Sequence, residues 1–239
     1  MKATAIEFKL RGLWIGLIFW MGFALYTVDH VNLGQVIIEF VVRLTNASGL
    51  LVAHCLFALA AVLAALAALL RTWATSYLSK EVVHNSQMYS DVVVADGPYR
   101  YTRNPLYLGT DLLALSMAPM ASRLGAAVIV LGIVVFNYRL ILREEAGLEA
   151  EQGEGYRSLV RSVPRLIPAL SPRLPAGGKR ADWKSGFLGE SYFWAFALGE
   201  ICFAISLKMS VLAASIAISI ALLMIASWQA SRKKRPASA

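Results

Sequence analysis

Six apolar runs separated by short polar segments dominate the chain, and they cover residues 13–28, 50–70, 105–121, 124–142, 187–207 and 209–228. A helix needs about 20 predominantly apolar residues to cross the ~30 Å hydrocarbon core of a bilayer. The shorter runs therefore need flanking residues or local bilayer thinning to span it. The pattern predicts an all-α integral membrane protein with about six transmembrane helices.

Residues 29–48 follow a different pattern, because charged residues interrupt the apolar ones at regular intervals. Glu39 and Arg43 lie between apolar side chains that recur at helical spacing, namely Val36, Ile37, Phe40, Val41 and Leu44. An apolar stripe opposite a polar face is typical of a helix that lies on a membrane surface. We expect a short amphipathic helix here.

The third and fourth apolar runs are separated only by residues 122–123, so we expect them to form a tight helical hairpin. Such a hairpin returns residues 143–145 to the membrane face from which the third run departs. On the returning helix, Asn137 and Glu144 are two turns apart and share one face. Two polar segments that are distant along the chain are therefore predicted to meet.

Composition supports the membrane class. Hydrophobic residues make up 58% of the 239 residues, charged residues 16%, and the mean hydropathy is +0.59, which excludes an ordinary soluble domain. Cys55 and Cys202 lie in apolar runs without metal-ligand spacing, so neither a disulfide framework nor a metal site is expected. The net charge of +8 comes from basic residues beside apolar runs, which favours membrane topology and anionic lipid over nucleic acid as its cause.

Basic residues cluster in the N-terminal segment and in residues 71–103, 143–184 and 232–235. With six crossings these segments fall on one face of the membrane. Because short loops rich in Lys and Arg remain in the cytoplasm, both termini and the site residues are predicted to be cytoplasmic. No small-residue cleavage site follows the first apolar run, so no signal peptide is expected.

The most informative polar stretch is GPYRYTRNPLYLG, from Gly97 to Gly109. The pair Gly97-Pro98 predicts a turn, and Pro105 suits the first residue of a helix. A helix N-terminus offers free N–H groups and a positive dipole end to an anion. Composition alone allows two interpretations, which are a membrane-edge turn with interfacial tyrosines and arginines and a ligand site.

A second stretch, GEGYRSLVRSVPRLIP, runs from Gly153 to Pro168 and follows the double glutamate Glu144-Glu145. In this order and spacing, the two stretches resemble the signature of integral-membrane methyltransferases related to isoprenylcysteine carboxyl methyltransferase and the phospholipid methyltransferases. The resemblance extends over about residues 71–168. Asn104 departs from the family pattern, where many relatives have His, and Asn keeps hydrogen bonding but does not titrate near neutral pH.

The resemblance implies S-adenosylmethionine as cofactor and methyl transfer to a lipophilic acceptor at the membrane interface. It assigns catalytic roles to Arg103, Glu144 and Glu145. The residues that it implies in cofactor binding are Gly97, Pro98, Tyr99, Arg103, Asn104, Pro105, Tyr107, Gly109, Glu144 and Glu145.

The chemistry of these residues suits that cofactor. Arg103, or the N–H groups around Pro105, could bind its carboxylate, and either glutamate could bind its ammonium or sulfonium. Tyrosine faces could bind the adenine or the sulfonium. The candidates for holding a carboxylate or phosphate of the acceptor are Arg100, Arg139 and Arg143.

Two other functions remain open. A membrane NADPH-dependent reductase of the sterol-reductase type also has an Arg/His/Asn-Pro-Tyr-Gly-like stretch, although no further reductase motif is evident. A non-enzymatic transporter or scaffold would use Asp111 and Glu200, which are ionisable residues within apolar runs, but the chain has no obvious internal repeat. His54 is interpreted as a hydrogen-bonded residue rather than a catalytic one.

The chain divides into three predicted parts. Residues 1–70 hold the N-terminal membrane helices and the surface helix. Residues 71–184 form the catalytic core with the signature, the hairpin and the basic tail, and residues 185–239 form a C-terminal helix pair. The small members of the family lack this pair, so we expect it to serve packing, oligomerisation or substrate enclosure rather than catalysis.

Overall fold

The structure, a computed structural model, describes residues 1–78 and 96–233, with the backbone alone for residues 226–233. Within these ranges the regular structure is helical, apart from an isolated bridge between Asn32 and Ser122. The prediction of an all-α protein is therefore confirmed. The polar segment that carries Lys80, Glu81, His84 and Asp91, and the side chains of the basic end at residues 232–235, lie outside the described part of the chain.

The N-terminal part contains α1 (Ala5–Lys9), α2 (Arg11–Ala24), the 3₁₀ turn η1 (Leu25–Thr27), α3 (Leu33–Thr45) and α4 (Gly49–Ser76). Thr4 and Glu7 form a capping box at the start of α1, and Asn32 caps α3 by accepting from the Gln35 N–H. The helix predicted over residues 29–48 is therefore present as α3.

The central part contains η2 (Gly97–Arg100), α6 (Pro105–Met117), η3 (Ala118–Met120), α7 (Arg123–Gln152) and α8 (Glu154–Ser162). The Ser122 hydroxyl caps α7 by accepting from the Gly125 N–H, which makes the tight turn of the predicted hairpin. The sequence predicted a helix over residues 124–142, but α7 continues to Gln152. It extends because no proline occurs in residues 143–152, and it ends at Gly153, which has a φ of +55°.

The C-terminal part contains α9 (Trp183–Gly189), α10 (Ser191–Ser206) and α11 (Met209–Lys233). The sequence predicted a single span over residues 187–207. Instead, α9 and α10 meet at Glu190 with a bend of 67°. Asp182 caps α9, and the Asp182 N–H donates to the Ser76 carbonyl at 2.8 Å, which ties this bend to the end of α4.

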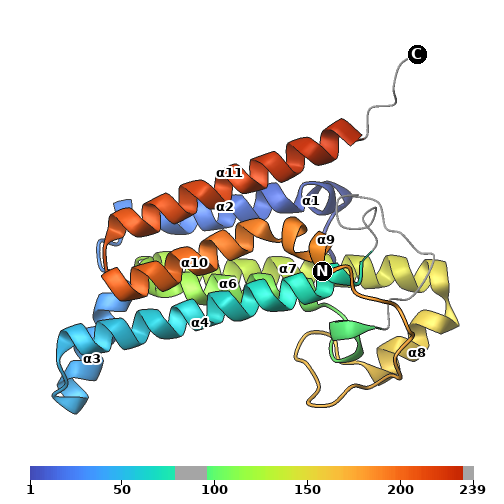
Figure 1. Cartoon of the computed structure of the whole chain (residues 1–239), viewed down its shortest axis with the longest axis horizontal. Coiled ribbons are helices and arrows are strands. Elements are labelled where there is room, and N and C mark those ends of the chain that lie inside the picture. The colour runs from blue at the N-terminus through green and yellow to red at the C-terminus, as the bar shows by residue number, and fades with distance from the viewer. Residues whose placement is uncertain (79–95, 234–239) are drawn as a thin grey trace.

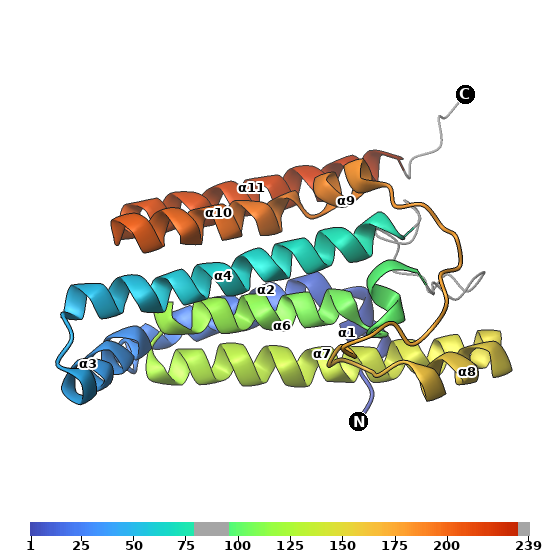
Figure 2. The ribbon, with the colours of Figure 1, turned by 60° about the horizontal axis from the view of Figure 1, so that its bottom comes forward.

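The long helices run side by side along the longest axis of the molecule (Figure 1). In the turned view, α4 lies between the α10–α11 pair and the α6–α7 hairpin (Figure 2). Packing follows the same order, because α10 contacts α4 and α11, α4 contacts α6, and α7 contacts α2 and α6. The short helix α3 closes one end of the bundle, and α8 extends from the other.

Small residues allow the helices to approach closely. Ala64, Ala67 and Ala68 of α4 are fully buried and pack with Leu113 of α6 and Phe193 of α10. The alanine-rich run of α4 thus allows close packing of α4 with α6 and α10.

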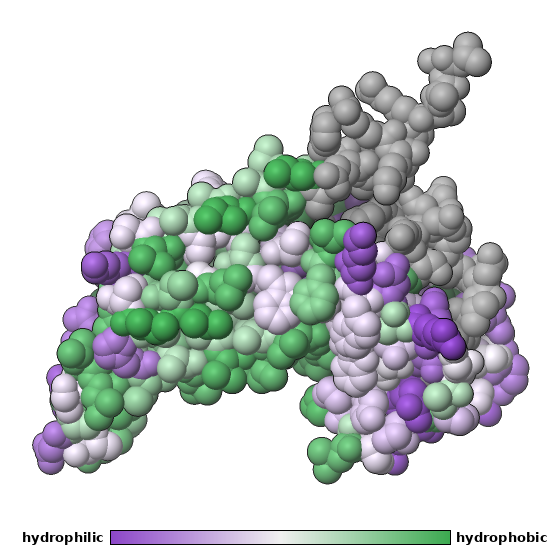
Figure 3. All heavy atoms as spheres, in the orientation of Figure 1, coloured by the Kyte–Doolittle hydropathy of each residue, from purple (hydrophilic) through white to green (hydrophobic). Residues whose placement is uncertain are grey.

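Two helices among the described residues, α4 and α7, are long and apolar enough to cross a membrane. The bent pair α9 and α10 makes a third if it forms one span. Apolar side chains cover the long helical body in the space-filling view, whereas polar ones gather over α8 and the segment near it (Figure 3). These features indicate an integral membrane protein. The prediction of six spans is not confirmed, because α2 and α6 have only 14 and 13 residues.

Candidate functional site

The signature stretch forms a compact turn against the end of α4. Gly97 has a φ of +56°, a conformation that glycine adopts without strain, and a Cβ at this position would overlap the Tyr77 ring. The rings of Trp73 and Tyr101 lie 5.9 Å apart between centroids. The first half of the signature is therefore shaped by aromatic residues of α4.

The basic tail that follows α8 is hydrogen-bonded to the signature along its length. The Arg103 N–H donates to the Pro164 carbonyl at 2.9 Å, and the Thr102 hydroxyl donates to the Leu166 carbonyl at 2.9 Å. The Ala169 N–H donates in turn to the Tyr101 carbonyl at 2.9 Å. The two stretches that carried the resemblance thus form one unit.

Glu145 lies at the centre of this unit and is 8% exposed. Its Oε1 is 2.9 Å from the Arg103 guanidinium, and its Oε2 is 2.9 Å from the Arg165 guanidinium. The Asn104 amide donates to Glu145 Oε1 at 3.3 Å and to the Arg165 carbonyl at 3.0 Å. The other terminal nitrogen of Arg103 donates to the carbonyls of Val160 and Val163. Glu145 and Arg103 therefore have most of their hydrogen-bonding capacity satisfied within the protein.

Glu144, by contrast, makes a single hydrogen bond within the part of the chain that the structure describes. The Tyr107 hydroxyl of α6 donates to its Oε2 at 2.9 Å. The other oxygen, Oε1, accepts no hydrogen bond from the residues that the structure describes. One carboxylate oxygen near the start of α6 is thus left as an acceptor for a ligand.

The N-terminal segment forms a wall beside this pair. Ala3 and Phe8 pack with Phe136 and Leu140 of α7, and Tyr107 lies against the cluster. The Ala3 N–H donates to the Arg139 carbonyl at 3.0 Å. No periodic pattern predicts this contact, because residues 1–10 precede the first apolar run.

Tyr99 lies among the charged groups of the site. Burial raises the pKa of its phenol, and the negative charges of Glu144 and Glu190 raise this pKa further. The positive charge of Arg71 lowers it in part. The hydroxyl therefore stays protonated through the physiological range. Tyr99 lies within electrostatic reach of Arg71 of α4, Glu144 of α7 and Glu190 at the bend between α9 and α10.

The first turn of α6 starts at Pro105 and lacks a side-chain cap. Asn104 is the residue before it, but its amide is used in the contacts to Glu145 and Arg165. The Leu106 and Tyr107 N–H groups near the positive end of the helix dipole are therefore not capped by Asn104.

Gly109, the last residue of the signature, permits close contact between α6 and α4. A Cβ here would overlap the Cγ of Arg71. Arg71 belongs to the last two turns of α4 and pairs with Glu190. Sequence reasoning missed both as site residues, although an arginine at the end of an apolar run was a usable signal.

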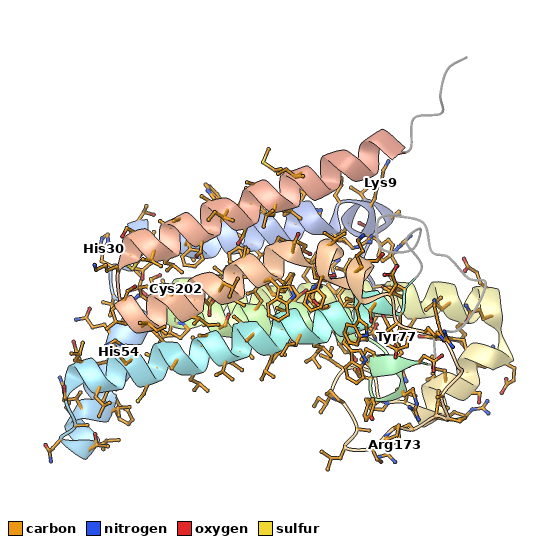
Figure 4. The ribbon with its side chains drawn as sticks, in the orientation of Figure 1. Lys9, His30, His54, Tyr77, Arg173 and Cys202 are labelled. Carbon is orange, nitrogen blue, oxygen red and sulfur yellow. The ribbon has the colours of Figure 1, made fainter. Side chains whose placement is uncertain are left out.

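The remaining candidates from the sequence lie apart from the Tyr107–Glu144 pair or have partners of their own. Asp111 accepts from the Asn137 amide at 2.7 Å, Glu200 accepts from Ser116 at 3.0 Å, and a ring nitrogen of His54 lies 2.6 Å from the Ala204 carbonyl. In Figure 4, Tyr77 and Arg173 lie at the signature end, whereas His54 and Cys202 lie toward the end that carries His30.

The three arginines considered for the acceptor are also paired. Arg100 donates to the Leu174 carbonyl at 2.8 Å, Arg139 forms an ion pair with Glu7 at 2.9 Å, and Arg143 donates to the Ala3 carbonyl at 3.0 Å. An open hollow of about 570 Å³ lies between Arg103, Arg173 and the tail at residues 160–169. Arginine side chains therefore line the hollow that lies beside the signature.

The structure thus brings the predicted residues together in two adjacent groups. Arg103, Asn104 and Glu145 join the signature to the basic tail. Tyr99, Tyr107 and Glu144 form the second group, near the uncapped start of α6. The hairpin prediction is confirmed by these contacts between α6 and α7.

Comparison with known families agrees with the resemblance seen in the sequence. The model of the phospholipid methyltransferase family matches residues 55–151. This segment extends from α4 to the end of α7 and includes Arg71, the signature and both glutamates. Searches of curated proteins and of solved structures returned no match. The matched segment is less than half of the chain, and it contains the signature and the double glutamate on which the resemblance rests.

Proposed function

We propose that this chain, whose residues 55–151 match the phospholipid methyltransferase family, transfers a methyl group from S-adenosylmethionine to a lipophilic acceptor at the membrane interface. The observation that carries the proposal is the contrast between the two glutamates. Glu145 is enclosed by two arginines, whereas Glu144 keeps one carboxylate oxygen without a partner among the described residues.

The residues of the second group fit the chemistry of the cofactor. Glu144 Oε1 would accept N–H groups of its ammonium, and the Leu106 and Tyr107 N–H groups at the start of α6 would donate to its carboxylate. The rings of Tyr99 and Tyr107 would offer π faces to a cationic or planar group. The hydrogen-bond donors and acceptors of the site thus match a ligand that carries both a positive ammonium and a negative carboxylate.

When bound, S-adenosylmethionine supplies an electrophilic methyl group on a sulfonium whose charge disappears during transfer. Such a reaction needs a desolvated site and a well-positioned acceptor more than it needs acid–base catalysis. Ala3 and Phe8 exclude water from one side of Tyr107. Asn104, which does not titrate near neutral pH, is compatible with this chemistry.

In this proposal Arg103 and Glu145 do not contact the cofactor. They stabilise the structure of the site. Their pairing holds the tail against the signature and thereby fixes the start of α6. This is our proposal for two residues to which the family resemblance had assigned catalytic roles. It leaves Glu144 as the glutamate that faces the cofactor.

The lipophilic acceptor is inferred from the position of the site. The site lies where the apolar helical body meets the polar part around α8 (Figure 3). A water-soluble cofactor can reach this level from the polar side, and an acyl or prenyl chain can reach it from the bilayer. We place this end of the molecule on the cytoplasmic side, as the distribution of basic residues predicts.

The test is calorimetric titration of the detergent-purified protein with S-adenosylmethionine and, separately, with NADPH. It is followed by an assay for transfer of labelled methyl groups to a membrane lipid extract. Saturable S-adenosylmethionine binding and labelled lipid are expected. Binding of NADPH without S-adenosylmethionine would move the protein to the reductase class, and binding of neither would favour a non-enzymatic role.

A further inference from the structure

Arg71 of α4 uses all five of its N–H donors within the protein. Its Nε and one terminal nitrogen contact the two carboxylate oxygens of Glu190 at 2.6 and 3.1 Å, and that nitrogen also donates to the Tyr192 hydroxyl at 3.2 Å. The other terminal nitrogen donates to the Leu106 carbonyl at 2.9 Å and to the Thr110 hydroxyl at 3.1 Å. Arg71 therefore links the C-terminal helices to the first turns of α6.

Glu190 is almost completely buried, with 2% of its side chain exposed, and Arg71 is 13% exposed. The Thr75 hydroxyl adds a third hydrogen bond to the Glu190 carboxylate at 2.7 Å. The Arg71 guanidinium lies 4.2 Å from the centroid of the Phe193 ring. A buried charge pair with this many hydrogen bonds fixes the geometry of both partners.

The pair belongs to two different parts of the chain. Arg71 lies within residues 55–151, which match the family, whereas Glu190 lies outside them at the bend between α9 and α10. The bend turns the chain so that Glu190 faces α4. The C-terminal helix pair thus contributes a charged side chain directly to the structure around the signature.

Arg71 also contacts the signature itself. The aliphatic part of its side chain lies where a Cβ of Gly109 would be. Its guanidinium donates a hydrogen bond to the Leu106 carbonyl, and Leu106 is the residue whose N–H group we assign to the cofactor carboxylate. A change in Arg71 therefore alters the position of the first turn of α6. The charges of Arg71 and Glu190 both shift the pKa of the Tyr99 phenol. Both residues therefore lie near the second group, which contains Tyr99, Tyr107 and Glu144.

We propose that Glu190 is a positioning residue for the cofactor site, because its carboxylate holds Arg71 against the first turn of α6. The C-terminal helices are then required for cofactor affinity, in addition to any role in packing or substrate enclosure. This inference rests on the proposed function. It revises the expectation from the sequence that the C-terminal pair serves packing, oligomerisation or substrate enclosure rather than catalysis.

The test compares S-adenosylmethionine affinity and melting temperature for the full-length protein in detergent. Glu190→Gln removes the charge with little change in shape. Glu200→Gln is the matched control, because Glu200 is also a buried carboxylate on α10 that bonds to α6, through Ser116. We expect Glu190→Gln to raise the dissociation constant tenfold or more, and Glu200→Gln to change it by less than twofold.

A second variant separates positioning from stability. Replacing a buried ion pair with apolar residues often preserves stability, so Arg71→Met/Glu190→Met should melt close to the wild type but still bind S-adenosylmethionine at least tenfold more weakly. Normal or tighter binding by the double variant, or by Glu190→Gln, would overturn the proposal. If the wild type does not bind S-adenosylmethionine but both variants fold, the proposed function fails, and this inference fails with it.

Discussion

The Tyr107 hydroxyl donates a hydrogen bond of 2.9 Å to Oε2 of Glu144, and these residues are 37 positions apart in the sequence. The bond joins the first turn of α6 to the C-terminal half of α7. It orients the Glu144 carboxylate so that Oε1 is the oxygen left without a partner among the described residues. The hairpin therefore places an acceptor beside the N–H groups at the start of α6.

The first prediction concerns the hydroxyl that orients this carboxylate. Tyr107→Phe keeps the ring and removes the hydrogen bond, and a bond to a charged group contributes roughly 1.5–3 kcal/mol. Part of that free energy should appear as a rise of about tenfold in the dissociation constant for S-adenosylmethionine, measured by calorimetry. Tyr138→Phe is the control, because Tyr138 accepts from Arg165 in the other group. Equal effects of the two variants would contradict the assignment.

The second prediction concerns the role of Glu145 in stability. Glu145→Gln leaves Arg103 and Arg165 without their carboxylate, and disrupting a buried pair costs about 3 kcal/mol. For a chain of this size, that loss corresponds to a decrease of roughly 6–12 °C in melting temperature. Thermal unfolding in detergent measures it.

Glu149→Gln is the control for this measurement, because Glu149 forms an exposed ion pair with Arg157 and such pairs contribute little. The melting temperature of this variant should remain within about 2 °C of the wild type. A stable Glu145→Gln protein would exclude a structural role for the Glu145 network.

The third prediction concerns the opposite end of the bundle and pH. Asp29 accepts hydrogen bonds from Arg123 and from the Leu124 N–H, and these contacts lower its pKa from 3.8 to about 2. Because the folded-state pKa is depressed, the stabilisation is complete above the unfolded pKa and is lost as pH falls toward 2. Asp29→Asn should therefore lower the melting temperature at pH 6, with a difference from wild type that shrinks below pH 4.

Thermal unfolding between pH 3 and pH 7 measures this difference. Glu39→Gln, an exposed change at the same end of the molecule, should show no such pH dependence. Cofactor affinity at neutral pH should remain that of the wild type in both variants, because the two residues lie far from the signature. If the difference in melting temperature between Asp29→Asn and the wild type is constant across the pH range, the Asp29–Arg123 pair is excluded as its source.

The hairpin could be predicted because its signals are local. A tight turn at Ser122 and two apolar runs require the second helix to return, and helical periodicity then places Glu144 at the level of the signature. The same reasoning did not distinguish Glu144 from Glu145. That distinction depends on Arg165, which approaches from the tail after α8, and no periodicity specifies where a tail without regular structure lies.

Contacts between distant segments were also missed. The sequence predicted one helix over residues 187–207, because the apolar run is nearly continuous apart from Glu190 and Glu200. The chain bends at Glu190, whose side chain pairs there with Arg71, a residue 119 positions earlier in the chain. The wall formed by Ala3 and Phe8 was missed for the same reason, since it depends on tertiary packing rather than on a local pattern.

The most direct test of the account is the affinity of Glu144→Gln for S-adenosylmethionine, measured by calorimetry beside the wild type. Glu151→Gln, an exposed change on the same helix, is the control. We expect Glu144→Gln to fold with a melting temperature near that of the wild type and to bind at least tenfold more weakly, because its carboxylate is the acceptor that we assign to the cofactor ammonium. Wild-type affinity in Glu144→Gln would contradict that assignment and, with it, the proposed cofactor site.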